Sequence, residues 1–409
     1  MKEVIYMNQL IHTPAGVRDV FGDEYERKNL LMGKINRLFG MYGYRYIQTP
    51  TIEYYPVFDE DKGTMHGSKL FRMIDADGHT LVLRPDFTPS IARAVTMYHK
   101  DEKLPIRFCY RGNVFLNNTT YRGRLNESTE MGVELINYDS PEADAELIAL
   151  SVEIMKAAGL RDFQISIGNV AYYNALTKEA GLDEDTVVQI RHLLSTRNQF
   201  GALELIEKQD MDGEVKKTLL ELTQLFGDVS VLEKAEKATS NSDAKKAIER
   251  LKAVYDILKE YGCSENITFD MGMLSDYSYY TGIIMQAVTY GSGDAVIKGG
   301  RYNRFIEKFG KQAAAVGFTT LVDSILMALQ RQGLAEEIKK DRIMILYSEE
   351  TSKKAIGYAM RYRAEGQKVT CMPLTDDLTK EAYVENAKAD HYAKLIILNN
   401  DDVNEEIIF

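Results

Sequence analysis

The stretch HTLVLRPDFT, at residues 79–88, runs from aliphatic and β-branched side chains into an Arg-Pro-acid-x-Thr turn. Its first half is typical of a β-strand, and its proline ends that strand. Two further runs of the same kind, PIRFCYRGNVF and EMGVELIN, follow at residues 105–115 and 130–137, with turn-prone segments between them. Strands that follow one another in this way predict an antiparallel sheet.

Sequence on both sides of these strands extends the sheet and covers it. Apolar residues at helical spacing predict a helix at residues 25–41, and YGYRYIQTPTIEY, at residues 42–54, predicts an edge strand that Pro50 interrupts. The other predicted core elements are a helix at residues 144–158, strands that begin near residues 163, 267, 279 and 294, and a closing helix at residues 322–332.

The middle and the end of the chain have different patterns. Residues 170–261 contain long helical stretches and no strand of comparable strength, so we predict a helical insertion into a core formed by residues 1–169 and 262–335. Residues 336–409 alternate strand and helix, which is typical of a small α/β module with a mostly parallel sheet. The expected fold class is therefore α+β.

Composition limits the classes of function. The 409 residues exceed what one hydrophobic core usually supports, and a net charge of −11 argues against a nucleic-acid-binding face, because affinity for a polyanion depends on clustered cations. Three widely spaced cysteines fit free thiols in a reducing compartment. No run of about 20 apolar residues predicts a membrane span. We expect a cytoplasmic protein without membrane association.

Motifs for metal or phosphate chemistry are missing from the sequence. The histidines show neither His-Glu-x-x-His nor Cys/His ligand spacing, so neither a metal nor a cofactor is expected. GGRY at residues 299–302 lacks the Gly-x-Gly-x-x-Gly register, which favours close backbone packing over a phosphate loop.

Five motifs in a fixed order resemble the catalytic core of class II histidyl-tRNA synthetases. The resemblance covers about residues 13–332, includes the helical insertion and continues more weakly into the C-terminal module. It implies a class II aminoacyl-tRNA synthetase-like sheet core. The motifs are LRPDFT at residues 83–88, RGR at 122–124, MGVE at 131–134, YYTG at 279–282 and GGRY at 299–302.

For the site, this resemblance implies a pocket for free histidine. In that family the turn after LRP and the Gly-x-Glu strand bind the substrate's ammonium group, which needs acceptors for three donors, and the tyrosine pair shapes the imidazole pocket. A strand-end salt bridge for the acids, and a plain core role for the tyrosines, stay open as alternatives. Carried over by position, the set is Asp86, Thr88, Glu130, Glu134, Tyr279 and Tyr280, with Glu130 where Gln is usual.

Three positions at which the family carries arginine have no cation here: Leu116, Ser275 and Ser324. Adenylation needs cations that hold the α-phosphate and compensate the charge that develops during the reaction. We therefore predict a site that binds an amino acid and has no catalytic residue. An acidic pocket would suit an ammonium group and repel a triphosphate. The charges expected around it are Arg111, Arg122 and Arg124 facing Glu127, Glu130 and Glu134, with Asp86 and Asp276 nearby.

A synthetase-like core without activating arginines, in an acidic chain, resembles the regulatory subunits of ATP phosphoribosyltransferase. That resemblance implies a non-catalytic, dimeric core in a hetero-oligomer with the short-form catalytic subunit, which performs the first step of histidine biosynthesis, and feedback by free histidine. No tRNA binding is expected, because the chain stops soon after AKLIILN at residues 393–399 and we find no closing strands or helix of an anticodon-binding domain.

Two other functions stay open at this point. In a divergent histidyl-tRNA synthetase, Arg111 or Arg124 would replace the missing arginines and activate histidine with ATP. In a solitary amino-acid-binding module, the partner would be a different protein.

Overall fold

The computed structural model describes residues 11–59, 64, 67–118, 125–196, 198–275, 277–398 and 403–409. The chain divides into two compact units, Met1–Ala335 and Glu336–Phe409. Among the described residues, no helix has the length and apolar character that crossing a membrane requires. The predicted α+β class is confirmed.

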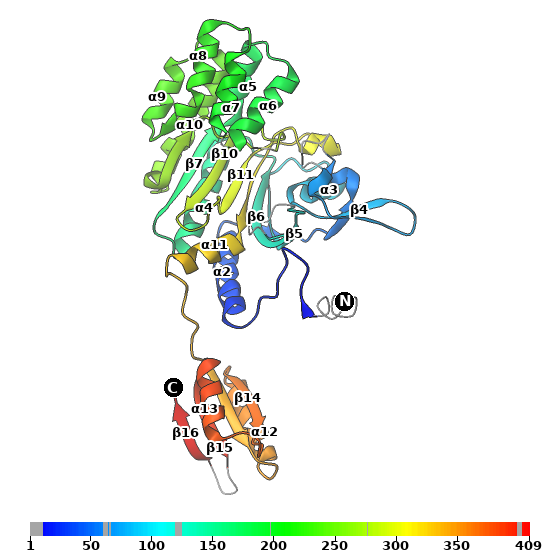
Figure 1. The fold of residues 1–409 in the computed structure, drawn as a ribbon, viewed down its shortest axis with the longest axis vertical. Helices are drawn as coiled ribbons and strands as arrows, with labels where there is room; N and C mark the ends of the chain where they lie inside the picture. Colours follow the sequence, from blue (N-terminus) through cyan, green and yellow to red (C-terminus); the bar gives the residue numbers. More distant parts are fainter. Residues whose placement is uncertain are drawn as a thin grey trace, which may run out of the picture. The chain divides into compact units, whose positions relative to one another are not determined.

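A nine-stranded sheet forms the centre of the first unit (Figure 1). Its six central strands, from β5 to β7 in the order below, pair antiparallel as predicted, whereas β1 pairs parallel with β5 and β9 pairs parallel with β7. The prediction of an antiparallel sheet was therefore wrong for these two pairs, while β8 pairs antiparallel with β9. The order is β1 (Arg45–Tyr46), β5 (Ile106–Phe115), β6 (Glu127–Ile136), β12 (Ala315–Leu321), β11 (Ile297–Arg301), β10 (Ile283–Thr289), β7 (Phe163–Asn169), β9 (Ile267–Asp270) and β8 (Phe226–Gly227).

Two strands that pair parallel need a long crossover connection between them, and both parallel pairs of this sheet have one. Between β7 and β9 the crossover is the helical insertion, which Figure 1 shows as a bundle in green. Short polar N-caps start most of its helices; the Asn241 side chain, for example, accepts the backbone N–H of Ala244 at 2.9 Å. The insertion holds α5 (Val170–Glu179), α6 (Glu184–Ser195), α7 (Gln199–Glu207), α8 (Gly213–Glu221), η4 (Leu222–Gln224), α9 (Ser230–Lys237) and α10 (Ser242–Glu260), and it also contributes β8, which the sequence did not predict.

Helices cover one face of the large sheet, and α4 (Pro141–Ala158) lies at their centre. Twelve of its 18 residues are buried, because it packs against the strands and also against α2 (Gly22–Met41) and α10, which themselves contact β6 and β7. The local sequence fixes both ends: the Ser140 hydroxyl accepts the Ala143 N–H at 3.2 Å, and Gly159 takes a left-handed conformation. Helix α11 (Val322–Arg331) packs on α2 and β6.

The other face carries a smaller layer that the sequence did not fully predict. The segment at residues 42–54 is not one strand, since Pro50 separates β1 of the large sheet from β2 of a three-stranded sheet. Helix α3, which we did not predict, begins directly after the LRPDF turn with Pro89 in its first turn. The elements here are β2 (Ile52–Tyr54), η1 (Tyr55–Phe58), η3 (Gly67–Lys69), β3 (Arg72–Ile74), β4 (Thr80–Leu83), α3 (Thr88–Tyr98) and η6 (Ile306–Phe309); η5 (Ser264–Asn266) instead precedes β9 and contacts α10 and β7.

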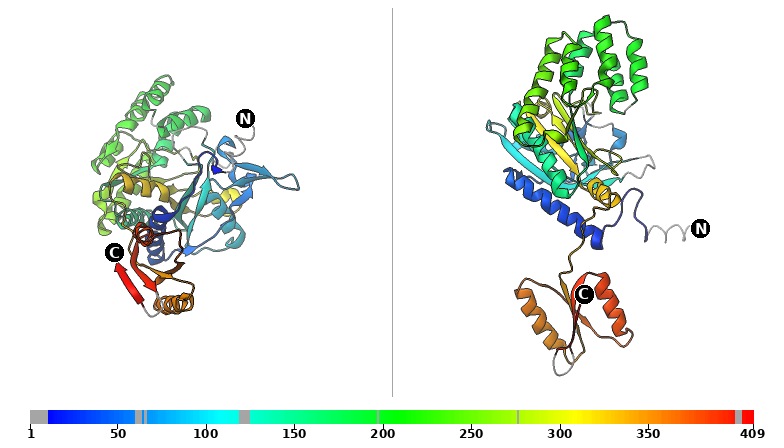
Figure 2. Two further views of the ribbon diagram at one scale, coloured as in Figure 1. Left: turned by 60° about the horizontal axis from the view of Figure 1, so that its bottom comes forward. Right: turned by 90° about the vertical axis from the view of Figure 1, so that its left-hand side faces the viewer.

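The second unit has a four-stranded sheet with one helix on each face (Figure 2). The first three strands are parallel, as predicted, but an antiparallel fourth strand, β16, adds to β15 where we expected no closing strand. The elements are β13 (Arg342–Tyr347), α12 (Ser352–Ala364), β14 (Lys368–Pro373), α13 (Lys380–Ala389), β15 (Tyr392–Leu398) and β16 (Val403–Ile408).

Candidate functional site

The turn between β4 and α3 presents the first two candidate residues. The backbone N–H of Thr88 donates to Asp86 Oδ1 at 3.0 Å, and the Tyr279 hydroxyl contacts Asp86 Oδ2 at 3.4 Å. Burial raises the pKa of Asp86 above its ordinary value. The turn therefore holds a carboxylate whose charged form is disfavoured by burial, and a bound cation would stabilise that form.

Two glutamates on β6 lie on the same side of the sheet as this turn. Glu134 is almost fully buried; it accepts a hydrogen bond from Thr88 Oγ1 at 2.7 Å on one oxygen and a short one from the Tyr302 hydroxyl on the other. Glu130 accepts one from Thr319 Oγ1 at 2.9 Å. Burial raises the pKa of each glutamate to about 8, and the nearby Asp86 charge adds to the rise.

Glycines on the neighbouring strands make room for these side chains. A Cβ on Gly317, which pairs with Glu134 in the β12–β6 ladder, would lie 1.6 Å from Glu134 Oε2. A Cβ on Gly300 would lie 2.9 Å from the Tyr280 ring. The glycine of GGRY and the glycine that precedes Phe318 are thus needed for close approach, as the sequence predicted for GGRY.

The tyrosines form an aromatic wall beside the acids. The Tyr279 ring lies 4.7 Å from Tyr280 and 4.6 Å from Phe305, measured between ring centroids. Tyr279 is buried and Tyr280 is partly exposed. Tyr302 belongs to the same wall, 5.9 Å from Tyr279, and binds Glu134. We missed Tyr302, although GGRY contains it; the signal would have been its place two residues after Gly300, which is in register with Glu134 through Gly317.

The arginines near the motifs are engaged elsewhere. Arg84 is buried, donates to the carbonyl oxygens of Asn113 and Thr49 at 2.9 Å each, and lies over the Phe87 ring. Arg301 of GGRY bonds Asp144 on the helix-covered face. Within the described part of the chain, none of Asp86, Glu130 and Glu134 forms an ion pair with a basic side chain.

The expected position of Arg111 was wrong. Arg111 pairs with Met131 across the β5–β6 ladder, whereas Glu130 pairs with Gly112. Because side chains alternate along a strand, Arg111 lies on the face opposite Glu130 and Glu134. The other expected charges, Arg122, Arg124 and Asp276, lie outside the described residues, and their roles stay predictions.

Two of the three positions without arginine take part in local hydrogen bonds. The N–H of Leu116 donates to Asn126 O at 2.8 Å, and Ser275 Oγ accepts the N–H of Tyr277 at 3.1 Å. Ser324 is half-buried in the first turn of α11. Together, the described geometry gathers carboxylate acceptors and aromatic rings on one face of the sheet, which are groups that can bind a small cation and an aromatic ring.

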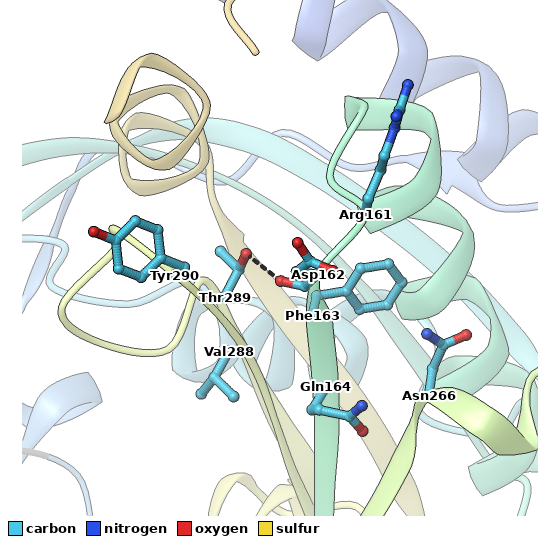
Figure 3. A pocket seen from close by; sticks show the side chains of 8 residues that line it. All are labelled: Arg161, Asp162, Phe163, Gln164, Asn266, Val288, Thr289 and Tyr290. Atoms are coloured by element: carbon cyan, nitrogen blue, oxygen red, sulfur yellow. Dashed lines mark hydrogen bonds between the residues drawn. The ribbon is translucent and has the colours of Figure 1, made fainter. Parts of the chain in front are cut away.

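Two other places in the molecule have single features of a binding site. A hollow of about 460 Å³ at the ends of β7 and β10 contains no candidate residue; it is shallow, and its side chains do not converge, as the outward Arg161 and Tyr290 in Figure 3 illustrate. Asp75, Asp77 and His79, in the β3–β4 turn, bring possible metal-ligand atoms within 4.8 Å of one another. Asp75 already accepts the N–H groups of Asp77 and His79, so turn formation explains the cluster.

Comparisons with known proteins identify the family to which the chain is similar. A family model described as histidyl-tRNA synthetase matches residues 16–325. An ATP phosphoribosyltransferase regulatory subunit from Acetivibrio thermocellus is 37% identical over 356 residues, which cover 87% of this chain and 85% of the relative. A regulatory subunit of the same name from Bacillus subtilis is 35% identical over 376 residues, covering 91% and 95%.

Solved structures extend the comparison to the fold. The structure of an ATP phosphoribosyltransferase regulatory subunit/histidyl-tRNA synthetase from Bacillus halodurans C has a TM-score of 0.84 at 30% identity and covers 96% of this chain and 99% of its own. Histidyl-tRNA synthetase from Nostoc sp. PCC 7120 reaches 0.80 at 17% identity, over 98% and 96%, and supports the fold alone. The predicted class II synthetase-like fold is confirmed.

Proposed function

The chain belongs to the family of ATP phosphoribosyltransferase regulatory subunits, and we propose on that premise that it binds free histidine and works with a separate, short-form catalytic subunit in the first step of histidine biosynthesis. We further propose that it works in the cytoplasm, as a self-dimer within a hetero-oligomer, and has no catalytic activity of its own. Family membership supports the partner, since a regulatory subunit requires one. The convergence of Asp86, Thr88 and Glu134 supports the ligand.

The pocket suits histidine because it offers acceptors and aromatic surface together. Asp86, Glu130 and Glu134 would receive the ammonium group, whose charge-assisted hydrogen bonds contribute about 1.5–3 kcal/mol each. Thr88 holds two of these carboxylates, because its N–H donates to Asp86 and its hydroxyl donates to Glu134. Tyr279 and Tyr280 would contact the imidazole.

The same pocket is poorly equipped to activate its ligand. Leu116, Ser275 and Ser324 provide no positive charge for phosphates, and each lost preorganised donor typically costs about 10²–10³ in rate. Buried, uncompensated carboxylates would also repel a triphosphate. A site of this kind recognises an amino acid without adenylating it.

Feedback would follow if histidine binds one quaternary state more tightly than another. Such coupling is typically about 1–3 kcal/mol, and a ligand shifts the equilibrium only by its differential affinity for the two states. In this proposal histidine regulates the catalytic partner through its different affinities for the two quaternary states.

A divergent histidyl-tRNA synthetase is the second candidate. The match of the synthetase family model to residues 16–325 and the double name of the Bacillus halodurans C protein favour it. It would require cations from elsewhere in the chain at the three vacant positions.

One purified preparation tests both candidates. We expect millimolar histidine to raise the melting temperature of the wild-type protein and to have no such effect on Glu134→Ala, because truncation removes the carboxylate between Thr88 and Tyr302. Glu127→Gln, on the same strand, should respond like the wild type. ATP–pyrophosphate exchange dependent on histidine should be absent. Exchange at an enzyme-like rate would establish the synthetase instead, and an unchanged wild-type melting temperature would count against histidine binding.

A further inference from the structure

Glu130 differs from the other pocket acids in how its oxygens are used. Glu134 accepts hydrogen bonds on both oxygens, and Asp86 has a donor at each of its oxygens. From the described residues, Glu130 receives one hydrogen bond, from Thr319 to Oε2. Within the described part of the chain its Oε1 has no hydrogen-bond donor, and the side chain is 8% exposed.

The surroundings of Glu130 disfavour its charged form. Asp86 adds negative charge, and the ionisable Tyr110 and Tyr280 lie within electrostatic reach. Among the described residues, the cations whose fields reach it are Arg84 and Lys298. Both are engaged elsewhere: Arg84 by backbone carbonyls, and Lys298 by Asp294 at 3.2 Å. Burial, with Asp86 as the next cause, accordingly raises the pKa of Glu130 to about 8.

We propose that Glu130 receives the ligand's ammonium group on Oε1 and releases a proton to solvent as the ligand binds. The O–H bond of the neutral carboxylic acid breaks, its electron pair stays on the carboxylate, and an N–H···O⁻ hydrogen bond forms in its place. The inference rests on the proposed function, since the ligand is the amino acid that this pocket takes. It adds that occupancy depends on pH through Glu130.

The sign of the pH dependence follows from linkage. Below the pKa of Glu130 the ligand must ionise the acid, so affinity is lower; as pH rises through about 8 this cost disappears. Affinity should increase up to about tenfold per pH unit between about pH 6 and 8 and then level off. The ligand's own groups titrate as well, so the informative quantity is the difference between the wild type and Glu130→Gln.

Calorimetric titration with histidine at pH 7.0, in phosphate and in Tris, measures the protons exchanged from the difference in buffer heats. We expect the wild type and Glu127→Gln, the same-strand control whose acid is held by Asn113, to release about one proton per ligand. Glu130→Gln should bind and release about one proton per ligand fewer than the wild type, because Glu134, whose pKa is also about 8, is unchanged in it. Because this variant could unfold, its melting curve is recorded first, and the pH dependence of wild-type affinity provides a test that needs no variant.

The outcomes separate the two proposals. Binding to the wild type without proton release, or with affinity independent of pH, overturns this inference and leaves histidine binding intact. Equal proton release from Glu130→Gln also overturns it and assigns the proton to Glu134. An absence of any binding heat with the wild type overturns the proposed function and this inference with it.

Discussion

At the scale of single residues, Gly317 is the position where adding one methyl group should most disturb the proposed binding site. Its Cα faces Glu134, and an added methyl group would also lie 2.7 Å from the backbone oxygen of Val133, which cannot move as a side-chain end can. We expect Gly317→Ala to lower the free energy of unfolding by about 1–3 kcal/mol through overpacking and to abolish the stabilisation by histidine. Denaturant unfolding with and without histidine measures both effects.

A glycine in open space provides the matched control. Gly33 lies inside α2, and apart from the backbone of its own helix no neighbouring atom lies within 4 Å of the position that an added methyl group would take. Gly33→Ala should therefore be neutral or stabilising by up to about 1 kcal/mol. Histidine should stabilise this variant as it does the wild type. If Gly317→Ala kept its full response to histidine, the ligand would have to bind away from Glu134.

Residue identity predicted part of the site and left other parts out. Asp86, Thr88 and Glu134 were named from motifs, and the structure brings them together by hydrogen bonds. Tyr302 was missed because its role depends on strand register, which motif spacing does not define. Arg111 was placed on the wrong face for the same reason: a single step along a strand reverses a side chain.

At the scale of elements, Asp144 joins three of them. This carboxylate, in the first turn of α4, bonds Arg301 of β11 and Arg250 of α10, each at 2.8 Å through Nε. Asp144 is 1% exposed and Arg301 4%, so removing the negative charge would leave a buried guanidinium with only the exposed Asp139, 3.3 Å away, as an acidic partner. We expect Asp144→Asn to cost about 3–5 kcal/mol of unfolding free energy, measured by denaturant titration.

An exposed pair on α10 is the comparison for this variant. Asp256 bonds Lys259 at 2.7 Å, and its side chain is 71% exposed, so Asp256→Asn should change the unfolding free energy by less than about 1 kcal/mol. If the two variants lost equal unfolding free energy, burial of the Asp144 ion pairs would not increase their contribution to stability.

Elements with strong periodicity were predicted well, and those that depend on tertiary pairing were not. Helix 25–41 is found as α2, and helix 144–158 as α4, each starting three residues earlier. In contrast, β8 has two residues and exists because β9 lies beside it. Pairing of this kind leaves no local pattern, so sequence-based prediction assigns such a segment to its helical surroundings.

At the scale of the whole molecule, the acidic surface and the family membership together predict the partners. A chain of net charge −11 should attract polyanions weakly, and a regulatory subunit should hold its catalytic subunit. We expect the tagged chain to recover an ATP phosphoribosyltransferase catalytic subunit from native extract, without tRNA, as identified by mass spectrometry and by the ratio of absorbance at the nucleic-acid and protein maxima.

Glu134→Ala is again the useful control, because its side chain is buried and should not touch a partner. It should recover the catalytic subunit as the wild type does while failing to respond to histidine. Recovery of tRNA that diminishes with added salt would contradict the expectation, as would the absence of the catalytic subunit.

The crossover between β7 and β9 has a consequence for how the first unit reaches its native state. Ile165 pairs with Ile267, so about a hundred residues of helices must be gathered before this edge of the sheet can close. Closing so large a loop has an entropic cost that local helix formation does not recover. The chain is therefore expected to form its helices rapidly and this edge of its sheet late. A nascent chain released before residue 267 would lack β9, the strand that pairs with β7 at this edge.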